Sequence, residues 1–148
     1  MAWVDLADLC DAIATTLDEI DELKRVESYN ELKEDFRDTP MAQVYPESGE
    51  TDVTSGTDRS GYRGGKRSVD TLFYVDIPCN QRSHLAEDMQ ATMEIIDLVE
   101  AKLTEQNTKP YFGHPDIMSF RWRWERITFE RSGGLYVGVR FQLWVRTF

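Results

Sequence analysis

The side chains that most often perform catalysis or bind metal ions are few in this 148-residue chain, and they lie apart along it. The two histidines, His84 and His114, are not accompanied by the set of Cys, Asp or second His ligands that a metal site or a catalytic triad requires. Neighbouring carboxylates occur at Glu87 and Asp88 and within residues 18–22, in helical patterns where such runs usually face solvent. The sequence therefore predicts no catalytic centre, no metal site and no cofactor.

Two short strings share features with binding motifs without fitting them. Residues 61–66, GYRGGK, lack the GxxxxGK[ST] spacing of a phosphate-binding loop, and a strand pattern rather than a helix follows them. Residues 121–124, RWRW, combine basic and aromatic side chains, as surfaces that bind single-stranded nucleic acid do. A strand points its arginines and tryptophans to opposite faces, which prevents a shared stacking platform. We expect the tryptophans in the core and the arginines on a solvated or interface face.

The charge of the chain is strongly acidic and unevenly distributed. Its net charge of −10 argues against a general phosphate-binding surface. Residues 1–38 contribute −8, residues 39–116 contribute −6, and residues 117–148, whose six basic side chains are all arginine, contribute +4. Copies of the chain with one acidic and one basic end are expected to attract each other head to tail or side to side.

The length of the chain and its two cysteines indicate one domain that folds without disulfide bonds. A chain of 148 residues is expected to bury roughly 70% of its unfolded surface. Cys10 and Cys79 lack metal-site spacing and are predicted to be reduced core thiols, with a disulfide between them as the alternative. There is no 18-residue apolar run, signal peptide or lipidation motif, so we expect synthesis in the cytoplasm and no membrane partner.

The first third of the chain predicts one helix, a possible second helical piece and a short strand. Apolar residues recur every three or four positions from Leu6 to Ile20, which predicts a helix over residues 3–25 with an acidic outer face. Residues 27–38 have a less regular pattern that could extend as helix until Thr39 and Pro40 end it. A strand over residues 41–45 is then closed by Pro46.

Residues 47–66 are predicted to form a long mobile loop. They contain five glycines among polar side chains, with too little apolar surface to offset the entropy of ordering. Two interpretations remain open, simple disorder and a segment that becomes ordered on a partner. The second is suggested by four acids that precede four bases, namely Glu47, Glu50, Asp52 and Asp58, then Arg59, Arg63, Lys66 and Arg67.

The second half predicts a strand, a helix and a C-terminal hairpin. Alternating apolar residues predict a strand over 67–77, and Ser83 is a candidate N-cap for an amphipathic helix over 83–106. Two strands over 120–148 surround a glycine turn at 132–134, and the odd-numbered residues 135–145 are predicted to face the core. Near residue 126 the apolar set changes phase, which implies a bulge or burial that differs along the strand.

Together these elements predict a single α+β domain over residues 1–148. The expected order is α-β-β-α-β-β, with a mainly antiparallel sheet, two helices packed on one face and the 47–66 loop inside the first hairpin. This order and length resemble the tail terminator proteins of long-tailed bacteriophages. The elements that carry the resemblance are residues 41–45, 67–77, 83–106 and 120–148.

The resemblance implies a virion structural protein of the tail and neck, without enzymatic activity. Members of that family form a ring, usually hexameric, on the last layer of the tail tube. The ring ends tube polymerisation and joins the tail to the head connector or stopper protein. An acidic lumen would let DNA pass through without specific binding.

The sequence also suggests which side chains would touch partners. By the resemblance, Arg59, Tyr62, Arg63 and Lys66 of the loop would meet the tube or a neighbouring subunit. The arginines of the C-terminal hairpin, Arg121, Arg123 and Arg140, are expected to meet an acidic helix of the next copy. The alternatives are a head-closure or head-tail adaptor protein and, from another class, a soluble α+β binding module or small enzyme. A nucleic-acid binder is the third.

Overall fold

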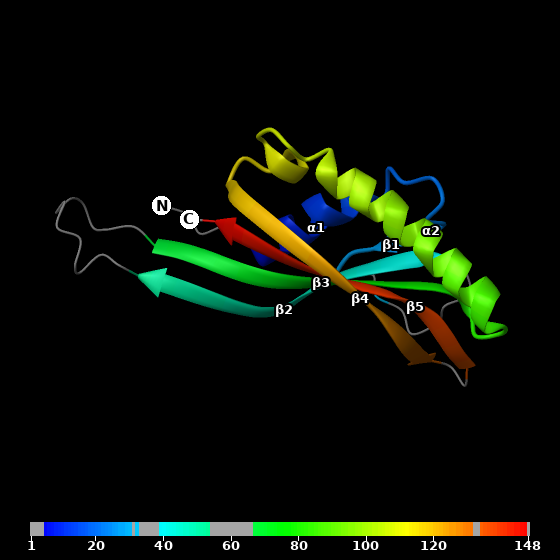
Figure 1. The fold of residues 1–148 in the computed structure, drawn as a ribbon. Helices are drawn as coiled ribbons and strands as arrows, with labels where there is room; N and C mark the ends of the chain where they lie inside the picture. The colour runs from blue at the N-terminus through cyan, green and yellow to red at the C-terminus, as the bar shows by residue number, and fades with distance from the viewer. Residues whose placement is uncertain (1–4, 31, 33–38, 54–66, 132–133, 148) are drawn as a thin grey trace, which may run out of the picture.

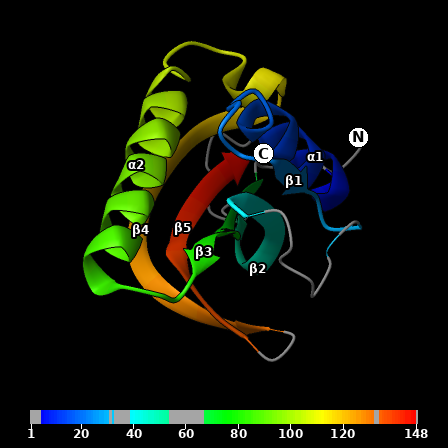
Figure 2. The ribbon, with the colours of Figure 1, turned by 90° about the vertical axis from the view of Figure 1, so that its right-hand side faces the viewer.

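The chain folds into a five-stranded sheet with both helices on one of its faces (Figures 1 and 2). The computed structural model describes residues 5–30, 32, 39–53, 67–131 and 134–147. In chain order the described elements are α1 (Leu6–Leu17), β1 (Arg25–Glu27), β2 (Met41–Val53), β3 (Arg67–Gln81), α2 (Leu85–Thr104), the 3-10 turn η2 (Tyr111–Gly113), β4 (Ile117–Arg131) and β5 (Gly134–Thr147). The strands lie in the order β1-β2-β3-β5-β4, and only β1 runs parallel to its neighbour. The predicted α+β class is confirmed, with one additional short strand.

The first helix is shorter than predicted. Asp5 begins α1 by accepting a hydrogen bond from the backbone N–H of Ala7, and the helix ends at Leu17 rather than Arg25. Ile20 and Leu23 continue the apolar spacing, but they lie in a tight turn after the helix, where their side chains are buried. Such spacing indicates burial on one side of the chain and does not require a helix. Residues 25–27 pair with residues 41–43 as β1, which contradicts a helical piece beginning there. Residues 33–38 of that piece lie outside the described residues.

Strand β2 extends well beyond the predicted end at Tyr45. Residues 48–53 pair with residues 67–72 of β3, so the prediction of a loop from residue 47 is wrong for residues 47–53. Pro46 is tolerated because the pairing of β1 with β2 ends at Gln43, so that among the described strands β2 is a sheet edge at the proline, beside a register shift at Glu47. Pairing with β3 orders this polar stretch despite its composition. Residues 54–66 lie outside the described residues.

One main core lies between the helices and the sheet. Helix α1 contributes Leu9, Ile13 and Leu17, and α2, which begins within two residues of the predicted start, contributes Val99 and Leu103. The sheet contributes alternate residues of β3 and β5, namely Phe73, Val75, Ile77, Val139, Phe141, Leu143 and Val145. The predicted core face of both strands is therefore confirmed, although Leu135 at the hairpin end is 39% exposed.

Both cysteines are free thiols within this core. Burial raises the pKa of Cys10 and the pKa of Cys79 to about 12 each, so neither is a thiolate near neutral pH. The prediction of reduced core thiols is confirmed, and the alternative of a disulfide between them is not.

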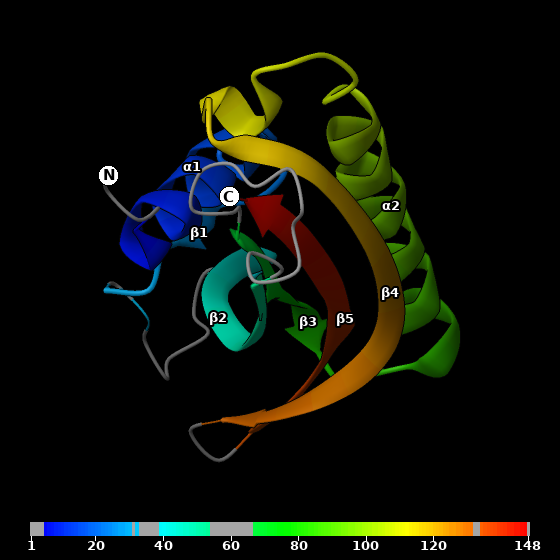
Figure 3. The same ribbon diagram turned by 90° about the vertical axis from the view of Figure 1, so that its left-hand side faces the viewer.

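The phase change in β4 is a change of burial and not a bulge. The register from Ser119 to Arg131 is continuous, and Trp122 packs on the helix side while Phe129 is buried on the opposite face against Met41. Two strands separate β2 from β4, about 14 Å in a flat sheet. The Met41–Phe129 contact therefore requires the strong bend seen in Figure 3, where β4 and β5 arc around β2. Trp124, expected in the core, is 43% exposed.

A close approach between β3 and β5 makes one glycine necessary. At Gly138 a Cβ atom would overlap the carbonyl oxygen of Ile77, whereas at Gly49 the nearest atom, the Asp70 carbonyl oxygen, lies 3.7 Å away. We expect Gly138→Ala to lower the free energy of unfolding by about 1–3 kcal/mol, because the two backbones must separate. The matched change Gly49→Ala should stay within about 0.5 kcal/mol of the parent in urea denaturation. Equal effects of the two substitutions would contradict the close approach.

Candidate functional site

The residues considered for catalysis do not come together in the fold. His84 is exposed at the start of α2, and His114 accepts a hydrogen bond from the backbone N–H of Asp116 at 3.2 Å. Among the described residues no group of three or more His, Cys, Asp or Glu side chains could hold a metal ion. Glu87 is exposed as expected, but Asp88 is only 5% exposed, which contradicts the prediction that this pair faces solvent.

The predicted interface arginines share one face of the C-terminal hairpin, opposite the helices. Arg121, Arg123 and Arg140 pair in register with Trp144, Gln142 and Glu125 on that face. The guanidinium of Arg121 lies 4.2 Å above the Trp144 ring, and Arg123, whose side chain is 62% exposed, is 3.9 Å from Glu125. The loop residues Arg59, Tyr62, Arg63 and Lys66 lie outside the described residues.

Arg140 is tied to its own chain. Its Nε atom donates to Asp76 Oδ1 at 2.6 Å, and its guanidinium lies 4.2 Å above the Tyr74 ring. The hydroxyl of Tyr45 donates to Asp76 Oδ2 at 2.5 Å. The bond to Asp76 raises the pKa of Arg140, and burial, followed by the bond to Asp76, raises the pKa of Tyr45. Arg140 therefore balances a buried carboxylate within its own chain, and its contact with a neighbouring subunit stays a prediction.

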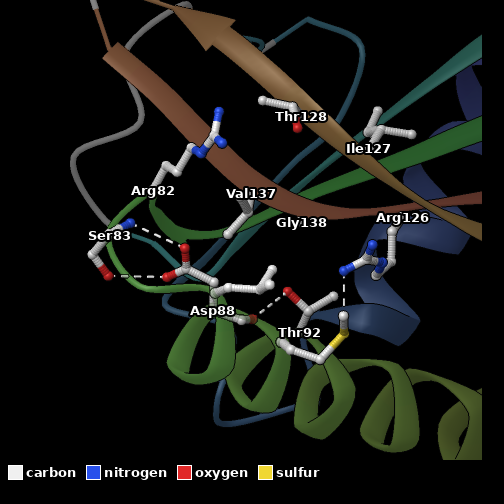
Figure 4. A pocket seen from close by; sticks show the side chains of 11 residues that line it. Arg82, Ser83, Asp88, Thr92, Arg126, Ile127, Thr128, Val137 and Gly138 are labelled. Carbon is white, nitrogen blue, oxygen red and sulfur yellow. Dashed lines mark hydrogen bonds between the residues drawn. The ribbon is translucent and has the colours of Figure 1, made fainter.

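A cleft of about 380 Å³ lies between α2, the end of β3 and the β4–β5 hairpin (Figure 4). We call it the α2 cleft, and its lining includes Arg82, Ser83, Asp88, Met89, Arg126 and Thr128. Sequence reasoning did not identify it, because its residues come from three elements that are distant in the chain. The sequence contained one weak indication of this cleft, the phase change in β4, because Arg126 follows Trp122 and Trp124 on the side of the strand that faces the helices.

The carboxylate in the α2 cleft is satisfied by its neighbours. Asp88 accepts hydrogen bonds from the backbone N–H of Ser83 at 3.0 Å, from the Ser83 hydroxyl at 3.0 Å and from Asn80 Nδ2 at 2.6 Å. These bonds, led by the one from the Ser83 backbone, lower the pKa of Asp88. Ser83, predicted as the N-cap of α2, instead holds this carboxylate, and His84 occupies the N-cap position. Asp88 is thus an internal support of the cleft.

The two arginines of the α2 cleft have no carboxylate partner among the described residues. Arg126 Nη1 donates only to the thioether sulfur of Met89, at 3.1 Å, and the guanidinium of Arg82 has no described hydrogen bond. By contrast, Arg140 and Arg146 bind Asp76 and Asp70. A guanidinium presents a planar fork of donors that matches a carboxylate or a phosphate. The α2 cleft can therefore receive an anionic group from another molecule.

Comparison of the sequence with known protein-family models and with curated proteins found no match. Within the described part of the chain, neither helix has the length and apolarity needed to cross a bilayer.

The Asp76–Arg140 pair should contribute more to stability than the exposed Asp70–Arg146 pair on the same strands. Asp76 is 2% exposed, so Arg140→Met leaves a buried carboxylate without its cation and should cost about 2–4 kcal/mol. Arg146→Met is the matched control, since it removes the same type of side chain from a pair in which both partners remain solvated. Urea denaturation of both variants measures the difference. Similar losses of unfolding free energy in the two variants would show that burial does not determine how much the Asp76–Arg140 pair contributes to stability.

The stability that Asp88 supplies should depend on pH with a defined sign. Because hydrogen bonds lower its pKa in the folded state, the contribution is fully present above the unfolded pKa, near 4, and is lost as the pH falls through the folded pKa. Asp88→Asn should therefore reduce the urea midpoint at pH 7, and the reduction should shrink toward pH 2. Asp97→Asn, an exposed acid on the same helix, is the control and should show little change. A deficit for Asp88→Asn that grows in acid would refute the assignment.

Proposed function

We propose that this chain is a structural virion protein that forms a ring, ends the polymerisation of a phage tail tube and joins the tail to the head connector. The observation that carries the proposal is the one-sided cover of the sheet. Helices lie on one face only, and β4, 15 residues long, forms an edge whose outer backbone pairs with no described strand. An uncovered face and a long edge strand are surfaces that proteins either shield or use for contact with another chain.

The arrangement of charge supports assembly. The outer face of α1 exposes Asp8 and Asp11, and Asp18 at its end is also exposed, while the C-terminal hairpin exposes Arg121 and Arg123. Opposite charges on different sides of one subunit favour contacts between copies, and an acidic lumen would repel the phosphates of passing DNA. The order of hairpin, helix and hairpin, which resembles the tail terminators, gives the proposal its particular form. The partners would be further copies, the tail tube protein and the connector or stopper protein.

Two other functions are alternatives, and each predicts a different binding behaviour. A head-closure or head-tail adaptor protein would use the same uncovered surface, but it would bind the connector without arresting tube growth. The α2 cleft favours a small binding module as the candidate from another class, because it offers two arginines to an anionic ligand.

Mass in solution and binding to tube ends test the proposal. We expect the purified protein to sediment at several times the mass of one chain, and tail tubes assembled with it to stop at uniform lengths with the protein at one end in electron micrographs. Added salt should shift the ring toward monomer, because paired surface charges are screened. A protein that stays monomeric at every concentration and leaves tube growth unchanged would refute the function. Binding to connectors alone would identify the adaptor.

A further inference from the structure

The α2 cleft presents positive charge in a protein that is otherwise rich in acids. The chain has 27 acidic and 17 basic side chains, yet neither Arg82 nor Arg126 is paired with a carboxylate among the described residues. The nearest acid in the cleft, Asp88, is occupied by Ser83 and Asn80. The guanidinium of Arg126 donates to the sulfur of Met89, and in Figure 4 it lies away from Asp88. The cleft is therefore arranged to take an anion from outside the subunit.

The chain also carries an exposed acidic segment far from the cleft. We call residues 18–22 the acidic turn, and in it Asp18, Asp21 and Glu22 are exposed and have no basic partner among the described residues. Its remaining acid, Glu19, binds Lys102 Nζ at 2.6 Å and so places the turn beside the C-terminal end of α2. The α2 cleft lies at the N-terminal end of the same helix. A 20-residue helix is about 30 Å long, so the turn cannot reach the cleft of its own subunit.

We infer that the acidic turn of one copy of this chain docks in the α2 cleft of the next copy, where its carboxylates pair with Arg82 and Arg126. This inference rests on the proposed ring and specifies the contact that joins its subunits. Complementary sites at opposite ends of one helix make a heterologous contact, and repetition of such a contact forms a ring when the rotation between successive copies closes. Part of the acidic excess of residues 1–38 and the positive charge of the α2 cleft would then meet between subunits.

A phosphate group is the other anion that two arginines could hold, and the charge of the protein favours the carboxylates. The net charge of −10 repels nucleic acid and free phosphate, whereas an acidic turn on every subunit supplies one docking segment for each cleft. The carboxylates of the turn belong to the chain itself, so their docking requires no additional molecule.

Charge reversal with a matched control tests the contact. Arg82→Glu with Arg126→Glu should raise the protein concentration needed for half assembly by about tenfold or more, measured by sedimentation at low salt. Arg121→Glu with Arg123→Glu changes the net charge equally on the opposite face, and it should weaken assembly less than the reversal in the cleft does. Arg82→Gln with Arg126→Gln should weaken assembly in the same direction and replaces the reversal if that variant fails to fold by circular dichroism.

Exchange of the two charge sets completes the test. Asp18→Lys, Asp21→Lys and Glu22→Lys together should also weaken assembly, and mixing this variant with the Arg82→Glu, Arg126→Glu variant should restore joint oligomers. A ring that forms normally in the cleft variant, or fails only in the Arg121, Arg123 control, overturns this contact but leaves the proposed function standing. A monomeric parent overturns the proposed function itself. Binding of inorganic phosphate or an oligonucleotide that depends on Arg82 and Arg126, without a change in mass, would assign the cleft to phosphate and overturn the inference.

Discussion

The pairing of β3 with β5 is the constraint on which the rest of the molecule depends. These two strands are central in the sheet, and their register places Asp76 opposite Arg140 and Asp70 opposite Arg146. A slip of one residue would turn these charges into the helix-covered core and bring its apolar residues to the open face, so the ion pairs and the hydrophobic pattern specify the same register. The close backbone approach at Gly138 belongs to this pairing. Helices, edge strands and clefts all take their positions from it.

Covering one face of that sheet and bending it produces both cores. The helices bury alternate residues of β3 and β5, while the opposite face curls until Met41 and Phe129 meet across two intervening strands. Bending also allows residues on the face without helices, such as Asp76, to become buried. A buried charge needs a partner, and Arg140 and Tyr45 supply it. The polar face is thus partly an internal structure and partly a surface open to other subunits.

The arginines divide into those that stabilise the subunit and those that are available to others. Arg140 and Arg146 hold strands together, and Arg121 lies on Trp144. Arg82, which follows the end of β3, and Arg126 of β4 line the same cleft beside α2 without carboxylate partners among the described residues. Because the exposed acids of residues 18–22 lie near the other end of that helix, the subunit is electrically polar along α2. Such polarity would favour the repeated head-to-tail contacts of the proposed assembly.

Local periodicity was sufficient to predict the core-facing sides of β3 and β5, the amphipathic α2 and the α+β class. The reason is that the spacing of apolar residues close together in the sequence indicates the buried side of a strand or helix. It was insufficient wherever a distant partner determined the outcome. Pairing with β3 carried β2 through Pro46 and on to Val53, and pairing with β2 made residues 25–27 a strand. The burial of Asp88, the engagement of Arg140 by Asp76 and the meeting of Arg82 with Arg126 join residues from separate elements. Contacts of that kind depend on how the strands bend and align in space, and residue spacing along the chain does not encode them.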